Sequence, residues 1–331
     1  MDMENILFDL QNLSVEFRTD EETVYAVNNV SIKLAAFKTL GIVGETGAGK
    51  TTTAKALLRL TPKHSVVTCN KLEINGRDVM KLSAKDLEKM RGQDIAMIFQ
   101  DPMTSLNPVM TVGKQITESI LIHQAVSKTD AVRQAEKMLE LVGIPASRAG
   151  EYPHQFSGGM RQRVVIAIAL SCNPKILIAD EPTTALDVTI QGQVLDLMKN
   201  LKKQYGTSMI MITHDLGIVA EICDDVAVMY AGTIVERGTI SDIFRETLHP
   251  YTEGLFNSLP NIKNRRNRLK PIPGMMPDPT KKPDGCPFAP RCGYVNQRCV
   301  NTPLVERQIS DTHFVSCIAY DNPNFKIERR R

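Results

Sequence analysis

Hydrophobic positions in the first 260 residues follow the order of an α/β domain. Apolar residues recur through residues 7–17 and 24–34, which predicts two strands, and the short run 40–43 predicts a third. A helical pattern follows over residues 50–60. An apolar run, a glycine-rich turn and a helix in that order are typical of a nucleotide-binding α/β domain.

The middle of the chain continues this alternation up to a change of composition near residue 260. Helical spacing predicts helices over residues 112–142 and 158–170; apolar runs predict strands over 95–99, 176–179 and 208–212 and a hairpin over 226–229 and 232–238. A basic stretch at 264–268 and recurring prolines then predict a domain boundary near 260. No internal repeat is visible, so we expect one nucleotide-binding domain, residues 1–260, and a smaller region, residues 261–331.

Composition adds few constraints. The chain has 331 residues, of which 42% are apolar and 23% charged, which is ordinary for a globular protein. The net charge of +3 gives no reason to expect a nucleic-acid partner. No stretch approaches the roughly 20 apolar residues that a membrane-spanning helix needs, so a membrane role would require partner subunits.

One segment predicts a phosphate-binding loop. It fits the pattern G-x-x-x-x-G-K-[ST] in full and reads Gly44-Glu45-Thr46-Gly47-Ala48-Gly49-Lys50-Thr51. The glycines let backbone N–H groups curl around phosphates, and the following helix directs its positive end at them. We expect Lys50 to reach the β- and γ-phosphates of ATP and the Thr51 hydroxyl to bind Mg²⁺.

A pair of acids follows the predicted strand 176–179. Asp180 at a strand end is placed to hold Mg²⁺, and Glu181 is placed to orient or deprotonate a water molecule. By themselves the two acids also fit a solvated turn before Pro182. Together with the phosphate loop they indicate hydrolysis of ATP.

A third motif, Ser157-Gly158-Gly159, opens the predicted helix 158–170 and offers a second anion-binding helix end. With it, residues 5–260 resemble the ATP-binding cassette (ABC) family. The resemblance implies an α/β P-loop NTPase fold with a RecA-like core, an antiparallel β subdomain, a helical signature subdomain over about 104–172, and a small Cys-rich C-terminal region. The usual signature has Leu and Gln where this chain has Phe156 and Met160.

The resemblance also implies roles for individual residues. Catalytic roles fall to Glu181, His214 and Gln100, and Mg²⁺ ligation to Thr51, Gln100 and Asp180. Phe17 is implied to stack on adenine, with Tyr25 as a weaker candidate. The phosphate loop, Thr52, Asp180 and Asp187 are implied to contact the ATP as well. Ser157, Gly158 and Gly159 are implied to act on ATP held by the partner subunit.

One turn departs from the family pattern. Most ABC domains have Gly-Glu before the strand that leads into the phosphate loop, whereas this chain has Ala36-Phe37-Lys38. A positive φ at Phe37 would cost about 1–2 kcal/mol, so we expect a rearranged turn there.

The resemblance narrows to the dipeptide and oligopeptide importers, closest to their D-type ATPase subunits. It is carried by residues 97–108, 179–189 and 249–252 and by Pro290-Arg291-Cys292. It implies a second ABC ATPase subunit, the importer's "F" subunit, with a homodimer of this chain as the alternative. It also implies two membrane-spanning permeases, an extracytoplasmic peptide-binding protein, and a peripheral place on the cytoplasmic face of a bacterial or archaeal membrane. Nickel import is the alternative cargo; a DNA-repair ATPase and a redox-sensing ATPase are further alternatives.

Four cysteines gather near the C-terminal end, at Cys286, Cys292, Cys299 and Cys317, with the spacing C-x5-C-x6-C-x17-C. This is looser than the usual zinc and ferredoxin patterns. Four thiolates suit an iron–sulfur cluster or zinc, and four separate thiols, some buried as apolar side chains, are the alternative. The resemblance implies a [4Fe–4S] cluster.

Overall fold

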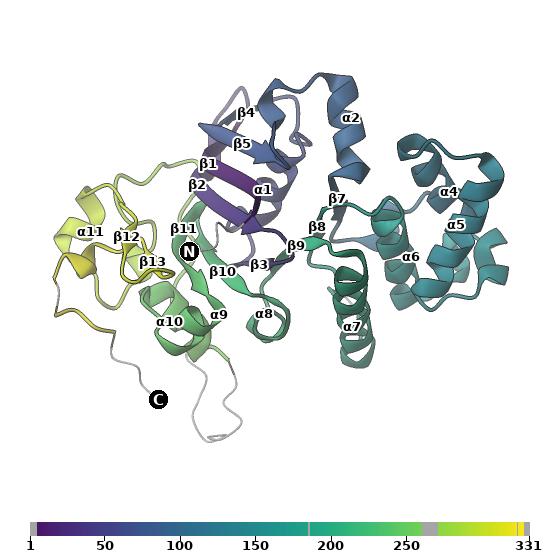
Figure 1. The fold of residues 1–331 in the computed structure, drawn as a ribbon. Helices are drawn as coiled ribbons and strands as arrows, with labels where there is room; N and C mark the ends of the chain where they lie inside the picture. Colours follow the sequence, from purple (N-terminus) through teal and green to yellow (C-terminus); the bar gives the residue numbers. More distant parts are fainter. Residues whose placement is uncertain (1–4, 185, 260–270, 323, 328–331) are drawn as a thin grey trace. The chain divides into compact units, whose positions relative to one another are not determined.

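A computed structural model (Figure 1) describes residues 5–184, 186–259, 271–322 and 324–327. These residues form two compact units. Unit 1 takes in Lys33–Thr39 and Glu73–Ile212 with the described residues before Asp9. Unit 2 takes in Asp9–Ile32, Leu40–Leu72 and the described residues from Thr213 onward. Each unit is therefore built from separate stretches of the chain.

Unit 1 contains three parallel strands whose carboxyl ends carry predicted site residues. The strand β8 (Ile176–Asp180) pairs with β7 (Ile95–Ile98) and with β9 (Ser208–Thr213). Every residue of β8 and β9 is buried, as expected of parallel strands covered on both faces, which read as continuous apolar runs. The three predicted strands are confirmed.

The helices of unit 1 include a group in which α4, α5 and α6 lie together (Figure 1). The helices of unit 1 are α2 (Ala84–Gln93), α3 (Pro102–Ser105), α4 (Val112–His123), α5 (Lys128–Leu141), α6 (Gly158–Leu170) and α7 (Val188–Tyr205). Short 3₁₀ turns span Val79–Lys81, Ala146–Gly150 and Pro153–Gln155. No helix among the described residues is long and apolar enough to cross a bilayer.

The helical pattern expected over residues 112–142 is confirmed, and it forms two helices. Two helices occupy this range, because α4 ends at His123 and Ser127 starts α5 by accepting a hydrogen bond from the Asp130 N–H at 3.1 Å. A serine at this position satisfies an N–H group that has no partner within the helix. The apolar spacing continues through the break because both helices bury one face.

The rearranged turn expected at Phe37 is wrong. Phe37 has a φ of +65°, the left-handed conformation that costs a side chain about 1–2 kcal/mol. Its N–H donates to the Ser208 hydroxyl at 2.7 Å, and its ring lies 3.1 Å from the place where Gly206 would carry a Cβ. These contacts hold the turn in the strained form.

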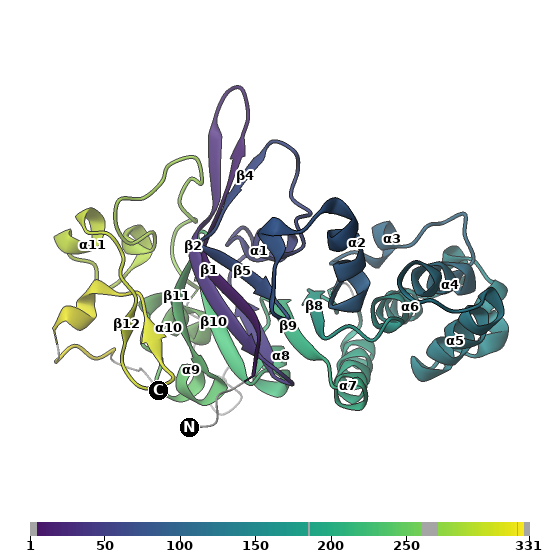
Figure 2. The same ribbon diagram turned by 45° about the horizontal axis from the view of Figure 1, so that its top comes forward.

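Unit 2 contains an antiparallel pair and a mixed sheet. The strand β1 (Ile6–Arg18) pairs with β4 (Ser65–Thr68) (Figure 2). In the mixed sheet β3 (Thr39–Val43) lies parallel to β10 (Asp225–Tyr230), which forms the predicted hairpin with β11 (Thr233–Thr239). Unit 2 also contains α1 (Lys50–Leu57), α8 (Leu216–Ile222), α9 (Ile240–Arg245) and α10 (Pro250–Asn257). The strands β2 (Thr23–Ala35) and β5 (Lys71–Ile74) have residues in both units, and β6 (Arg77–Asp78) belongs to unit 1.

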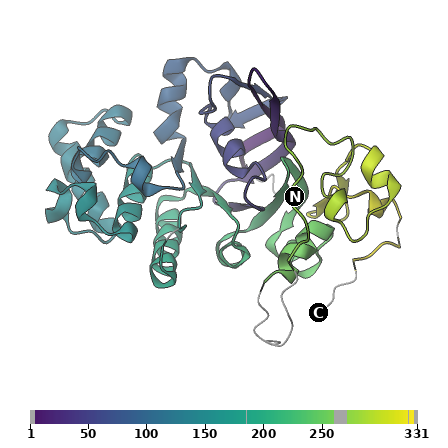
Figure 3. The ribbon, with the colours of Figure 1, turned by 180° about the vertical axis from the view of Figure 1, so that it is seen from behind.

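The described C-terminal residues extend the same sheet. The short strand β13 (Phe314–Val315) pairs with β11, and β12 (Arg307–Gln308) pairs with β13. This segment also contains α11 (Gln297–Asn301) and 3₁₀ turns at Ala289–Arg291 and Ile318–Asp321, shown in yellow in Figure 3. The predicted boundary near residue 260 falls beside residues 260–270, which lie outside the described residues.

A buried carboxylate joins this C-terminal segment to the sheet. Glu236 in β11 is 1% exposed and accepts hydrogen bonds from the N–H groups of Leu248 and His249, at 2.8 and 2.9 Å. Its Oε1 also lies 2.9 Å from Nε2 of His313, just before β13. A buried carboxylate is stable only when such partners surround it.

His249, at the start of α10, is buried in its neutral form. Its Nδ1 accepts the Tyr251 N–H at 3.1 Å, so its proton is on Nε2. Among the described residues that Nε2 is buried without a hydrogen-bond partner. Burial lowers the pKa of His249 from 6.5 to about 3.

We predict that this histidine makes the stability of the protein depend on pH. The folded pKa is below the unfolded value, so its contribution is complete above pH 6.5 and is lost as the pH falls toward about 3. The loss is at most about 1.4 kcal/mol per pH unit. His249→Asn retains a side chain that caps α10 and should flatten the dependence of the free energy of unfolding on pH in denaturant titrations. His154→Asn, at an exposed histidine, is the control; an equal flattening there would contradict the prediction.

Candidate functional site

The phosphate loop of unit 2 has a shape that only glycine permits at two positions. A Cβ on Gly44 would lie 2.1 Å from the carbonyl oxygen of Met229 in β10, and one on Gly49 would lie 2.5 Å from that of Ala26 in β2. Gly49 also has a φ of +98°. The loop is therefore packed against the backbone of two strands, and its glycines let its own backbone bend tightly.

Lys50 opens α1 directly after this loop. Its side-chain nitrogen donates to the carbonyl oxygens of Gly44 at 2.7 Å and Glu45 at 3.0 Å, and the residue is 5% exposed. The ammonium therefore lies inside the curve of the loop, beside the positive end of α1. Thr51 and Thr52 follow in the first turn of α1, half-buried. The arrangement is a compact site for an anion such as a phosphate.

The acid pair of unit 1 ends β8 as predicted. Asp180 is 1% exposed. Glu181 has a φ of +46°, a strained conformation for a residue with a side chain, and its N–H donates to the Ile212 carbonyl at 2.8 Å. Its carboxylate accepts hydrogen bonds from the Gln100 amide at 3.1 Å and the Thr184 hydroxyl at 2.9 Å. The structure thus brings Gln100 and Glu181 together.

Thr184 was not anticipated from the sequence. It follows Pro182 in a turn whose Thr184 N–H donates to the Glu181 carbonyl at 3.1 Å, so the turn places the hydroxyl beside the carboxylate. The sequence feature that could have predicted this contact is a threonine three residues after the candidate catalytic acid, with Pro182 between them to favour a turn.

The signature motif forms the start of α6. The Ser157 hydroxyl accepts the Met160 N–H at 3.4 Å, which caps the helix. A Cβ on Gly159 would lie 2.5 Å from the Ile190 Cγ2 in α7, so glycine permits the close approach of these helices. Phe156, one of the two departures from the family signature, is 3% exposed and lies under the Arg148 guanidinium at 4.3 Å. The packing of Phe156 in the interior therefore accommodates a phenylalanine where the usual signature has leucine.

The remaining predicted residues lie on strand ends and loops. His214 follows β9, where Asp215 caps α8 by accepting the Gly217 N–H at 2.7 Å. Asp187 is exposed at the start of α7. Phe17 in β1 has its ring centroid 6.0 Å from that of His64. The N–H of Tyr25 in β2 donates to the Pro279 carbonyl at 2.8 Å.

The four C-terminal cysteines affect one another electrostatically. Burial first, and the thiols of Cys317, Cys292 and Cys299 in addition, raise the pKa of Cys286 to about 12. Burial likewise raises the pKa of Cys317 to about 11. The all-sulfur donor set suits a soft metal centre. The arrangement does not: within the described residues, no group of three or more His, Cys, Asp or Glu is placed to hold a metal ion. The expected metal centre therefore has no geometric support.

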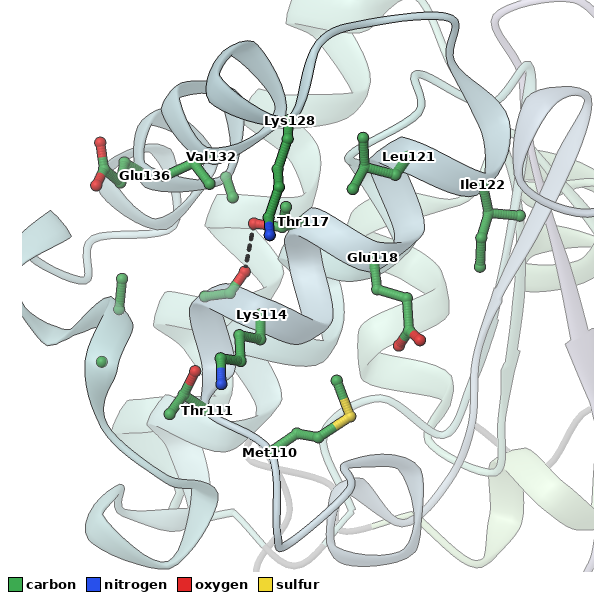
Figure 4. Close-up of a pocket in the computed structure, with 14 residues that line it drawn as sticks. Met110, Thr111, Lys114, Thr117, Glu118, Leu121, Ile122, Lys128, Val132 and Glu136 are labelled. Atoms are coloured by element: carbon green, nitrogen blue, oxygen red, sulfur yellow. Dashed lines mark hydrogen bonds between the residues drawn. The ribbon is translucent and has the colours of Figure 1, made fainter.

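A groove of about 660 Å³ runs over unit 1 between α4 and α5 (Figure 4). Its walls include exposed apolar side chains, of which Ile122 is 59% exposed and Leu121 and Val132 are each 40% exposed. Charged side chains of both signs also line it: Lys114, Glu118, Lys128 and Glu136. Within α4 the Thr117 hydroxyl donates to the Gly113 carbonyl at 2.7 Å, so this polar group is satisfied inside the groove.

Comparison with known families gives two matches. Residues 27–184 match the ABC transporter family, and residues 235–299 match the family described as oligopeptide/dipeptide transporter, C-terminal region.

Individual relatives cover most of the chain. The oligopeptide transport ATP-binding protein OppD of Bacillus subtilis is 50% identical over 93% of this chain and 87% of its own length. The dipeptide transport ATP-binding protein DppD of the same organism is 49% identical over 96% of each chain. Among solved structures, a dimeric ATP-binding cassette in a post-hydrolysis state with ADP and Pi is 26% identical, with a TM-score of 0.62 over 70% of this chain and 98% of that one.

Proposed function

Because this chain belongs to the ABC transporter family, as an ATPase subunit of an oligopeptide and dipeptide import system, we propose which of its residues carry the reaction. The phosphate loop 44–51 binds the triphosphate of ATP, with Lys50 on the β- and γ-phosphates. Ser157, Gly158 and Gly159 act on ATP held by a second ATPase subunit. The observation that supports this most directly is the position of the Lys50 ammonium inside the loop.

We assign the hydrolytic step to Glu181. Water attacks the γ-phosphorus, the bond to the β–γ bridging oxygen breaks, and ADP leaves with inorganic phosphate as the other product. Glu181 orients the water and accepts its proton, and the Gln100 and Thr184 hydrogen bonds fix the direction of its carboxylate. His214 contacts the γ-phosphate, Asp187 lies at the contact with the second ATPase, and Phe17 stacks on adenine.

Thr51, Gln100 and Asp180 are the proposed Mg²⁺ ligands. Hydroxyl, amide and carboxylate oxygens form a hard donor set that suits this ion. When bound, Mg²⁺ supplies positive charge against the phosphate oxygens.

We predict that Glu181→Gln lowers ATP turnover about a hundredfold or more while ATP still binds, because the amide cannot accept the proton. The measurements are phosphate release by the assembled transporter and retention of labelled ATP. Lys50→Ala should lose ATP binding itself. Lys55→Ala, in the same helix, is the control and should behave as wild type. Full turnover by either Glu181→Gln or Lys50→Ala would remove that residue from the reaction.

The finer assembly is also a proposal. We propose that a second ATPase, two permease subunits and an extracytoplasmic peptide-binding protein complete the transporter, and that this chain lies on the cytoplasmic face of the membrane. Dipeptides and oligopeptides are the proposed cargo, in keeping with the relatives named above. We further propose the domain limits 1–260 and 261–331 and a helical subdomain over about 104–172.

The α4–α5 groove is the proposed docking surface for a cytoplasmic helix of a permease. An ATPase subunit of an importer must transmit motion to a membrane partner, and an amphipathic helix fits an apolar groove with charged walls. Leu121, Ile122 and Val132 supply the exposed apolar surface.

We predict that Ile122→Asp reduces co-purification with the permease subunits, and peptide uptake, about tenfold or more, because it places a charge where docking would bury an apolar side chain. Binding of ATP to the separate subunit should not change. Ile309→Asp, at an apolar side chain that is 46% exposed in the C-terminal segment, is the control. Equal assembly of both variants would place the permease elsewhere.

For the C-terminal cysteines we propose a [4Fe–4S] cluster, with zinc as the alternative. Support comes from the all-thiol donor set of Cys286, Cys292, Cys299 and Cys317. The described arrangement would have to close around the metal, and no step of ATP hydrolysis is assigned to it. Protein purified without oxygen should contain iron and sulfide and show a broad visible absorption band that bleaches on reduction. Protein containing zinc or no metal would contradict the proposal.

A further inference from the structure

The Cys-rich segment contacts the phosphate loop directly within unit 2. Arg291, between Pro290 and Cys292, places its Nη1 3.0 Å from the Oε2 of Glu45, the second residue of the loop. The Arg291 side chain is 6% exposed and that of Glu45 is 30% exposed. An ion pair this sheltered is screened much less than a surface pair.

Arg291 is itself held on several sides. Its Nε donates to the Pro273 carbonyl at 2.8 Å, its Nη2 to the Ile272 carbonyl at 3.3 Å, and its Nη1 also to the Tyr230 hydroxyl at 3.3 Å. Although burial alone would lower it, the hydrogen bonds to Tyr230 and Glu45 raise the pKa of Arg291 above its usual value. The guanidinium is thus a fixed cation, with one edge directed at the loop.

The backbone of Glu45 is fixed from the same side. Its N–H donates to the Tyr251 hydroxyl at 2.9 Å, and Tyr251 is fully buried. The Tyr251 ring packs against Phe288 of the Cys-rich segment, with centroids 5.4 Å apart, and against Tyr230 at 4.6 Å. Both the amide and the carboxylate of Glu45 therefore depend on residues outside the loop.

A carboxylate inside a phosphate-binding loop needs such a partner. The triphosphate brings several negative charges to the loop, and an unpaired carboxylate beside them would repel it. We propose that Arg291 is a positioning residue for ATP binding: it neutralises Glu45 and holds this carboxylate in place, so that the Cys-rich segment sets the affinity of the phosphate loop for ATP. This inference rests on the proposed role of the loop.

The test is a double-mutant cycle on the full-length chain. We expect Arg291→Gln to weaken equilibrium binding of a fluorescent ATP analogue about tenfold, because the Glu45 charge is left unpaired. Glu45→Gln alone should change affinity less than about threefold, and the double variant should bind like Glu45→Gln. In the assembled transporter, Arg291→Gln should raise KM for ATP while kcat at saturating ATP is nearly unchanged. Arg291→Lys should fall between, because lysine keeps the charge but not the planar donor set.

Two controls separate the possible failures. Arg298→Gln removes another arginine of the same segment, one that pairs with Asp321 at the surface, and should bind the analogue normally. If Arg291→Gln matches Arg298→Gln, or if the double variant is as weak as Arg291→Gln alone, the inference is wrong. Lys50→Ala in the same assay tests the loop itself: normal binding there would overturn the proposed role of the loop, whereas its loss beside a normal Arg291→Gln overturns only the inference.

Discussion

The tight curl of the phosphate loop is the constraint on which the rest of unit 2 depends. Backbone amides can surround a triphosphate only if the loop approaches its neighbours more closely than a side chain permits. Gly44 lies against the carbonyl of Met229 and Gly49 against that of Ala26, so β10 and β2 form the support of the loop. The loop can therefore take its shape only where both strands are in place, and whatever fixes β10 also fixes the loop.

The C-terminal segment contributes to that support through β11. Its strand β13 pairs with β11, and the Arg237 guanidinium of β11 lies 3.7 Å from the centre of the Phe314 ring. The neighbouring residue Glu236 is buried, and its carboxylate needs the His313 ring as well as two backbone N–H groups to offset the cost of its burial. Since β11 forms a hairpin with β10, the segment stabilises the strand on which the loop rests, in addition to contacting Glu45.

What the sequence predicts well is local, and what it misses depends on distant partners. The phosphate loop and β8 can be recognised from runs of a few adjacent residues, although the shape of the loop also depends on β10 and β2. The break between α4 and α5 was also readable, because Ser127 followed by Asp130 marks a helix start, but the apolar spacing obscured it. The contact between Arg291 and Glu45 joins residues 246 positions apart, and β13 has two residues; no local pattern encodes either.

Strain shows how the site differs from an ordinary turn. Phe37 and Glu181 both have positive φ, at +65° and +46°, and each carries a cost of about 1–2 kcal/mol. At Phe37 the backbone N–H donates to the Ser208 hydroxyl, while the residue is 69% exposed. Only the backbone of Phe37 is therefore held by a hydrogen bond. At Glu181 the backbone is held by Ile212, and the carboxylate is held as well, by Gln100 and Thr184. The backbone and the carboxylate of Glu181 are therefore both fixed, as the proposed role of orienting a water molecule requires.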